Sequence, residues 1–417
     1  MAVAGLRGTG DWGTDERPKN FRELILWRNP NGMTPIFALS ARIAKESTDD
    51  PEFSWWTEPN DIVRLQINGA ILAAATTVVV DSGDPSVANP TLNWGTAQHL
   101  KEGDQLMVEP AADAAVFAPE IMRVVSVASA TTFTVVRGTA GTTAANIADD
   151  AHLLLIGSSY AEGTRAPLSN SRNPMKYSNY TQIFKDTYEL TGTATETKLR
   201  TGDPVKNDKK RKAFDHARAI EMSLLFGQKS EVVGANGKPQ RTFDGIRKFV
   251  AAQNTTVFAA PYDLNDLIDA LSPIFDFDTE AGDTRIAFVG NGALNAINYR
   301  MVNSAGQTAI RINYDAKATA WGMNFTEIIL PQGRVLLKTH PLMNRHAMYR
   351  NSMLIMDFSA LKWRPMRNRD TKFKDNAQLP DEDTRKGYWQ TEAGLEVWHG
   401  GLTLGWIGGM DQGVPAP

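Results

Sequence analysis

The stretch DPVKNDKKRKAFDHARAIEMSLLFGQ, residues 203–228, predicts the longest helix of the chain. Asp203 can accept hydrogen bonds from the free amides of the first turn, Pro204 suits the first helical position, and Gly227 permits a left-handed exit. At 1.5 Å per residue this helix would measure roughly 36–39 Å, enough to cross a domain. We call it the spine helix. Four residues spaced by four, three and four positions share one face of this helix, and they are Ala213, Ala217, Ile220 and Leu224. Phe214 and Leu225 flank that face.

The first two turns of the spine helix are strongly basic. Exposed cations there oppose the helix dipole by about 0.3–1 kcal/mol each, so the cluster indicates an acidic partner. Three readings stay open, which are a solvated charged face, a carboxylate-rich neighbouring subunit, and a nucleic-acid phosphate. The cluster consists of Lys206, Lys209, Lys210, Arg211 and Lys212.

Composition sets broad limits on the chain. Its 417 residues are enough for two or three hydrophobic cores. The apolar fraction of 42%, the charged fraction of 22% and the net charge of −3 are ordinary for a globular protein and give no general polyanion-binding signal. Without cysteine, the chain cannot form a disulfide or a thiolate metal site. We expect neither a signal peptide nor a membrane span, because the required apolar runs are missing.

The first half of the chain predicts an arm followed by a small β domain. Residues 1–53 begin with a Gly-rich stretch and carry short apolar segments such as Phe21–Arg28, so we expect an arm that needs a host surface. Short β-rich segments separated by turn residues then predict a sandwich or barrel. These segments are Ile62–Asn68, Thr76–Val80, Gln105–Glu109, Ile121–Val127, Thr132–Arg137 and His152–Gly157.

A long hairpin and a mixed α/β domain are predicted around the spine helix. Residues 180–188 alternate with the period of a strand, and with residues 54–63 they would form a hairpin carrying the β domain at its tip. A capped helix after Asp263 and a strand–turn–helix pattern around Gly290 predict an α/β domain over residues 246–345. The segment LEVWHGGLTLGWIGG, residues 395–409, predicts a long strand that returns to the spine helix.

Patterns for catalysis and metal binding are weak. The six His residues show no HExxH spacing, and we expect His216 to be packed rather than to bind a metal. The turn Gly290–Gly292 faintly resembles a phosphate-binding turn, but it lacks both the GxGxxG and the GxxxxGK[ST] pattern, so we expect a plain strand-to-helix turn. We expect the side chains of Asp381, Glu382 and Asp383 to be charged and exposed to solvent. We therefore predict no catalytic, cofactor-binding or metal-binding residue.

The stretch KWRPMRNRDTKFK, residues 362–374, is basic with interleaved aromatic residues. It could contact a phosphate backbone, or it could hold acidic residues of a neighbouring copy through bidentate arginine contacts. The slightly acidic net charge of the chain favours the second reading. Its cations are Lys362, Arg364, Arg367, Arg369, Lys372 and Lys374.

Several segments together resemble a tailed-phage major capsid protein of the Hong Kong 97-type fold, in a subfamily with a β-rich insertion. They are YTQIFKDTYELTGTATET (180–197), HARAIEMSLLFG (216–227), PQRTFDGI (239–246), WRPMRNRDTK (363–372) and TEAGLEVWHGG (391–401). The resemblance implies an α+β fold with an N-terminal arm (1–53), extended-loop strands (54–63 and 172–190) and an inserted β domain (64–171). It also implies a spine helix and peripheral domain (191–245), an axial domain (246–345), and returning peripheral strands (346–417).

The resemblance implies a non-enzymatic shell subunit. Hexamers and pentamers of the chain would form an icosahedral phage head around double-stranded DNA, assembled in the host bacterial cytoplasm. Its partners would be further copies, a separate scaffolding protein, a portal and decoration proteins, with no membrane contact and no cofactor. An encapsulin-like compartment and a phosphate-ligand enzyme using Gly290–Gly292 are the alternatives. The predicted interface residues are Lys206, Lys209, Lys210, Arg211, Arg364, Arg367, Arg369, Trp55, Trp56, Tyr180 and Phe184.

Overall fold

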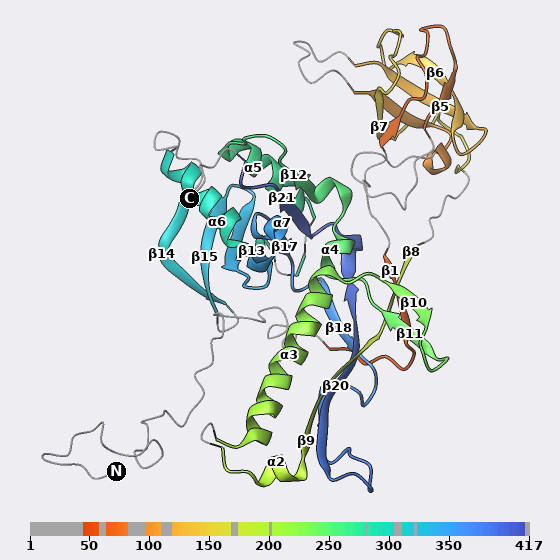
Figure 1. Ribbon diagram of the computed structural model, residues 1–417. Helices are drawn as coiled ribbons and strands as arrows, with labels where there is room; N and C mark the ends of the chain where they lie inside the picture. The colour runs from red at the N-terminus through yellow and green to blue at the C-terminus, as the bar shows by residue number, and fades with distance from the viewer. Residues whose placement is uncertain are drawn as a thin grey trace, which may run out of the picture.

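The computed structural model describes residues 45–57, 64–81, 97–109, 119–167, 174–199, 202–277, 279–280, 282–303, 311–320 and 323–412, with backbone alone for the described residues between 301 and 325 (Figure 1). Most of the predicted arm, residues 1–44, lies outside the described residues. So do residues 58–63 and 172–173 of the predicted extended-loop strands.

The predicted spine helix is α3, Pro204–Phe226. Asp203 caps it as predicted, because its Oδ1 accepts hydrogen bonds from the amides of Val205 (2.9 Å) and Lys206 (3.3 Å). The predicted left-handed exit at Gly227 is wrong, since this residue has φ −55° and ψ 152°. A Cβ at Gly227 would lie 2.5 Å from the carbonyl oxygen of Phe243, so glycine is required there for close backbone approach.

The buried face of α3 lies mainly in its second half. Ile220, Leu224 and Leu225 are buried as predicted, whereas Ala213 and Ala217 are only half-buried. The first half is dominated by Lys and Asp side chains, which leaves few apolar groups to bury. The spine helix is therefore fixed to the rest of the chain chiefly through its C-terminal half.

A four-stranded antiparallel sheet packs along α3 (Figure 1). Its central strand β20 (Thr384–Val397) pairs with β9 (Gln182–Thr191) along one edge, and with β18 (Leu361–Pro365) and β19 (Lys372–Lys374) along the other. Trp389 and Thr391 of β20 reach α3, since Trp389 donates to the Lys209 carbonyl and Thr391 contacts His216. The core between helix and sheet includes Phe184, Ile220, Leu224, Ala393, Leu395 and Val397.

The predicted strand over residues 172–190 is two strands with different partners. β8 (Met175–Tyr180) pairs with β1 (Glu52–Thr57) as the predicted hairpin, while β9 pairs with β20. The period-two alternation is confirmed along β9, where Phe184 and Tyr188 are buried and the odd-numbered residues between them are exposed. The break falls at the buried Thr181, whose amide donates to the Pro51 carbonyl.

The predicted long C-terminal strand is also interrupted. β20 ends at Val397, and the 3₁₀ turn Trp398–Gly401 leads to a second strand, β21 (Gly405–Gly408). Positive φ values at His399 (58°), Gly400 (58°) and Gly401 (77°) turn the chain away from the sheet. Period-two patterning alone did not reveal this turn.

A seven-stranded mixed sheet forms the α/β part of the chain. Its helices include α5 (Leu264–Leu271), with the predicted cap realised as a capping box of Asp263 and Asp266, and α6 (Asn291–Asn303). β17 and β21 come from the segment predicted as returning peripheral strands, so the predicted boundary at residue 345 does not follow the sheet. The strand order is β12 (Thr255–Val257), β21, β17 (Met353–Met356), β13 (Thr284–Val289), β16 (Gly333–Thr339), β15 (Met323–Leu330) and β14 (Arg311–Ala320).

The predicted β domain is a six-stranded barrel (Figure 1). Each predicted strand is present, and a bridge between Ile67 and Val80 joins the first strand of the series to the last, which closes the barrel. It encloses a hydrophobic core of its own. The strand order is β2 (Arg64–Gln66), β7 (His152–Ser158), β4 (Asp104–Val108), β5 (Ile121–Val127), β6 (Thr132–Thr139) and β3 (Thr77–Val79).

A buried ion pair holds the barrel loop after β6. Glu120 accepts hydrogen bonds from Arg137 (2.6 and 2.7 Å) and from the amides of Gly138 (3.2 Å) and Ala145 (3.0 Å). Burial alone would raise the pKa of Glu120, but these donors outweigh it and hold the pKa below its usual value. The charged form of Glu120 therefore stabilises the folded barrel.

This pKa shift predicts acid-sensitive protection of the barrel. Because the folded pKa is lowered, the stabilisation is complete above the unfolded pKa of Glu120 and is lost as the pH falls through the folded value. In hydrogen exchange corrected for intrinsic rates, protection of β5 and β6 should decline on acidification. Glu120→Gln should lower protection at neutral pH and flatten the decline; an equally steep decline in this variant would refute the assignment.

Two polar contacts fix α3 to the two sheets. His216, only 2% exposed, lies 2.8 Å from Asp186 of β9 and 2.8 Å from Thr391 of β20, which confirms its predicted packed role. Glu221 is fully buried, and its Oε1 lies 2.7 Å from Nε2 of His340. The Leu342 amide donates to Nδ1 of His340 (3.2 Å), so Nε2 carries the hydrogen that Glu221 accepts.

Removal of one partner of the Glu221–His340 pair should strongly destabilise the subunit. His340→Ala removes the hydrogen-bond donor of the buried Glu221 and leaves a cavity, which should cost about 2–5 kcal/mol. Glu221→Gln retains an acceptor for Nε2 and should cost clearly less. Urea denaturation of the two variants measures the difference, and a loss for Glu221→Gln as large as that for His340→Ala would contradict this prediction.

Candidate subunit interfaces

The end of the predicted arm forms an additional strand on the four-stranded sheet. We call Lys45–Asp49 the arm end. It runs parallel to β18, with bridges from Lys45 to Trp363 and from Thr48 to Met366. The amides of Glu46 and Thr48 donate to the carbonyls of Trp363 (3.2 Å) and Pro365 (3.0 Å). The arm end therefore covers the β18 edge, which would otherwise expose backbone groups.

Three ion pairs accompany this backbone pairing. Lys45 lies 2.9 Å from Asp370, Glu46 lies 2.7 Å from Arg364, and Asp49 lies 2.9 Å from Arg367. Burial opposes the charge on Asp370, but the hydrogen bonds from Lys45 and the Thr371 amide prevail, so its pKa is lowered. We call these contacts the arm ladder.

The predicted partner of the basic stretch needs correction. We expected Arg364, Arg367 and Arg369 to hold acidic residues of a neighbouring copy, yet each is paired within its own chain. Arg364 also lies 2.9 Å from the buried Glu396, and Arg369 is paired with Glu392. The acidic residues of the arm end, Glu46 and Asp49, were the sequence signal for this pairing.

The β1–β8 hairpin separates two tryptophans onto opposite faces. Trp55 is 7% exposed and packs against Tyr177 and Phe249, with ring centroids 6.1 and 6.0 Å apart. Trp56 is 63% exposed, and Lys176 lies 5.8 Å from its ring centroid. Phe184 is 6% exposed and belongs to the core under α3. Trp55 and Phe184 are thus buried within the chain, and only Trp56 of these three presents a surface.

Tyr180 connects this hairpin to the segment that follows α3. Nζ of Lys229 lies 4.4 Å from the Tyr180 ring centroid, and the Arg241 guanidinium lies 6.0 Å from it. Lys229 also donates to the Ser178 hydroxyl at 2.7 Å. Tyr180 is half-buried by these cations, so much of its surface is covered by its own chain.

The basic start of α3 is partly neutralised by its own helix. Lys206 lies 3.7 Å from Asp203 and Arg211 lies 3.8 Å from Asp208, both as i,i+3 pairs. Lys209 lies 3.6 Å from the Phe373 ring centroid. Lys206, Lys210 and Arg211 remain exposed, so this end of the helix still presents positive charge.

The Gly290–Gly292 turn is filled by the chain itself. The Asn291 amide donates to the Asn344 side chain (2.6 Å), and the Gly290 amide donates to the Ser352 carbonyl (3.0 Å). A Cβ at Gly290 would lie 2.2 Å from the Arg350 carbonyl oxygen, so this glycine permits close packing rather than ligand approach. The prediction of a plain strand-to-helix turn is confirmed. Within the described ranges, no three His, Asp or Glu side chains gather as a metal site requires.

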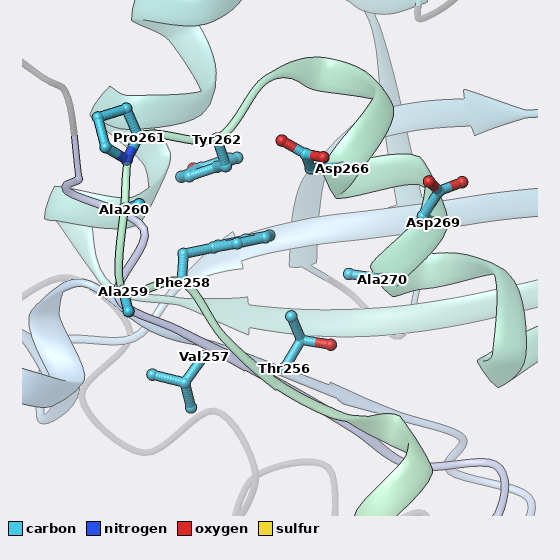
Figure 2. Close-up of a pocket in the computed structure, with 10 residues that line it drawn as sticks. All are labelled: Thr256, Val257, Phe258, Ala259, Ala260, Pro261, Tyr262, Asp266, Asp269 and Ala270. Carbon is cyan, nitrogen blue, oxygen red and sulfur yellow. The ribbon is translucent and has the colours of Figure 1, made fainter.

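A hollow of about 550 Å³ lies between β12, the segment after it and α5 (Figure 2). Phe258 and Tyr262 stack in it with ring centroids 4.0 Å apart, and the Tyr262 hydroxyl donates to the Met410 carbonyl at 3.1 Å. Burial raises the pKa of Tyr262 to about 12, although nearby Arg300 opposes the shift. Asp266 already caps α5, so the lining supplies packing contacts rather than a reactive group.

A protein-family model described as SU10 major capsid protein matches residues 8–409. The chain belongs to this family. The match confirms the resemblance inferred from the sequence. A major capsid protein of Pseudomonas phage PaMx41 is 25% identical over 401 residues, which cover 93% of the chain and 88% of that relative. The chain is therefore a structural component of a bacteriophage capsid.

Two of the solved structures that are similar to this capsid protein are a capsid and an encapsulin complex. The capsid of an empty GTA particle shares 11% identity with a TM-score of 0.48, covering 95% of this chain and 96% of that one. The holo-SrpI encapsulin complex from Synechococcus elongatus PCC 7942 shares 10% identity with a TM-score of 0.39, covering 60% and 81%. None of the helices in the described part of the capsid protein has the length and apolar character needed to cross a membrane.

The arm ladder predicts unequal roles for its arginines. Arg364 is 13% exposed and its loss removes the ion-pair partner of the buried Glu396, so Arg364→Ala should cost about 3–5 kcal/mol. Arg367 and Asp49 are both 68% exposed, so Arg367→Ala should cost less than about 1 kcal/mol. Urea denaturation and hydrogen exchange at residues 45–50 test this order, and a larger effect at Arg367 would contradict it.

Proposed function

We propose that the capsid protein assembles as hexamers and pentamers into an icosahedral head that encloses double-stranded DNA. Family membership supports a shell role. The observation that carries the proposal is the exposed Trp56 on the β1–β8 hairpin, a two-stranded ribbon whose other face packs on its own chain through Trp55. A large exposed apolar group is a liability unless another chain covers it.

Further copies are the partner that this hairpin fits best. Exposed Trp is favoured at protein interfaces because it supplies a large apolar area with a polar edge. Each contact between copies can be weak, because a subunit joined to several neighbours gains effective concentration from each of them. The exposed cations Lys206, Lys210 and Arg211 would face carboxylates of a neighbouring copy or the phosphates of packaged DNA.

The proposal includes partners beyond the chain itself. A separate scaffolding protein would direct curvature, a portal would occupy one vertex, and decoration proteins would bind outside. Assembly would take place in the host bacterial cytoplasm. We further propose that the arm (1–53), the peripheral part around α3 and the axial part around the seven-stranded sheet act as distinct contact regions of one subunit.

Particle formation tests this function. The capsid protein should be produced alone and together with the proteins encoded beside it, then examined by electron microscopy and assayed for nuclease-protected DNA. Closed shells of uniform size, and DNA in shells from infected cells, are expected. Shells that contain an enzyme cargo and no nucleic acid would point to a cellular compartment instead, and a strictly monomeric product under every condition would refute a shell role.

The two hairpin tryptophans offer a matched pair of variants. Trp56→Ser removes an exposed side chain, so it should leave the melting temperature of the subunit within about 2 °C and reduce particle yield. Trp55→Ser removes a buried side chain and should destabilise the subunit by about 3–5 kcal/mol. Thermal unfolding and particle counts separate the effects, and normal assembly of the Trp56 variant would exclude this residue from the interface.

A further inference from the structure

A second exposed ribbon follows α3. β10 (Ser230–Val233) pairs only with β11 (Pro239–Thr242) among the described strands, in antiparallel register from Ser230–Thr242 to Val233–Pro239. Val232 is 54% exposed, and Val233, at 80%, is the most exposed large hydrophobic side chain in the described residues. We call residues 232–239 the ribbon tip. Successive residues of a strand face opposite sides, so the ribbon presents one exposed valine on each face, and Val233 is the more exposed of the two.

The ribbon tip carries one cation that its own chain does not neutralise. Elsewhere on the ribbon, Arg241 is paired with Glu231 at 2.7 Å, and Lys229 donates to Ser178. Lys238 is exposed and forms no ion pair with any described residue. The tip therefore combines the exposed Val233 with a positive charge.

A second projection has the complementary character. Between β19 and β20, Leu379 is 59% exposed and is followed by Asp381, Glu382 and Asp383, which are also exposed. None of these three carboxylates forms an ion pair within the described ranges. The loop is held in place by its backbone, since Glu382 donates to the Leu379 carbonyl (3.2 Å) and Gly192 to the Asp383 carbonyl (3.0 Å). We call residues 379–383 the acidic loop.

We propose that the ribbon tip of one copy packs on the acidic loop of a second copy. Val233 would cover Leu379, while Lys238 would face the three carboxylates. Figure 1 shows the β10–β11 ribbon and the lower end of β20 as separate projections, so one chain does not bring the two together. The contact is heterologous, because it joins two different patches, and it can therefore propagate from copy to copy around a shell. This inference rests on the proposed shell function.

Cross-linking tests the contact directly, because the native chain contains no cysteine. A disulfide requires Cα atoms roughly 4.4–6.8 Å apart. In Val233→Cys/Leu379→Cys particles, mild oxidation should give a ladder of linked chains that reductant removes. Each single variant should lack the ladder. A control pair of Val233→Cys and Leu72→Cys, which uses an equally exposed barrel position at 69%, should also remain unlinked.

Charge exchange provides an independent readout. Lys238→Glu and Glu382→Lys should each lower particle yield about tenfold, as loss of one repeated contact is multiplied over many subunits. Lys238→Glu combined with Asp381→Lys and Glu382→Lys should recover to within about twofold of the native yield, because the loop then carries a net positive charge opposite the new carboxylate. Glu162→Lys, an exposed change on the barrel, serves as the control and should assemble normally.

The outcomes separate this contact from the function on which it rests. The contact is overturned if the native chain forms particles, the double-cysteine variant gives no ladder, and Lys238→Glu leaves the particle yield unchanged. The shell function would still stand in that case. Failure of the native chain to form particles with its co-encoded proteins would overturn both. Circular dichroism of each soluble variant verifies that a lost particle reflects a lost contact rather than misfolding.

Discussion

The buried pair of Glu221 and His340 fixes the spine helix against the seven-stranded sheet, and the remainder of the chain depends on that placement. His216, five residues earlier, fixes the same helix to β9 and β20. Apolar packing between these elements is not directional, so it alone would permit small rotations of the helix. Two hydrogen-bonded pairs directed at different sheets remove that freedom, because a rotation of α3 that keeps one contact breaks the other.

This fixed centre determines where the exposed limbs project. β20 carries α3 on one face and is paired at its edges with β9, β18 and β19. The arm end then closes the β18 edge through the arm ladder. The arginines predicted to hold a neighbour are used for this purpose, so the arm end is fixed along the β18 edge. Under the proposed assembly, contacts between copies would fall to groups that the described part of the chain leaves exposed, such as Trp56 and Val233.

Sequence patterns predicted what is local and missed what is distant. Caps such as Asp203 and Asp263, and the alternation along β9, depend on neighbouring residues and were identified correctly. The pairing of β9 with β20, and the entry of β17 and β21 into the seven-stranded sheet, join segments far apart in the chain and carry no local signature. Gly227 shows the same limit, because its role depends on the approach of Phe243. Alternation indicates which side chains are buried, but not what buries them.

The barrel and the two ribbons differ in whether their edge strands are paired. The barrel closes on itself through the Ile67–Val80 bridge and has a core of its own, so it adds a projecting module without open edges. Among the described strands, the β1–β8 and β10–β11 ribbons have no further strand partner, and both carry exposed apolar side chains. In a protein produced at the high concentration that a shell requires, open edges would favour disordered aggregation. Their retention at these two sites is explained if ordered contacts with further copies occupy them, and that requirement links the fold of the subunit to its assembly.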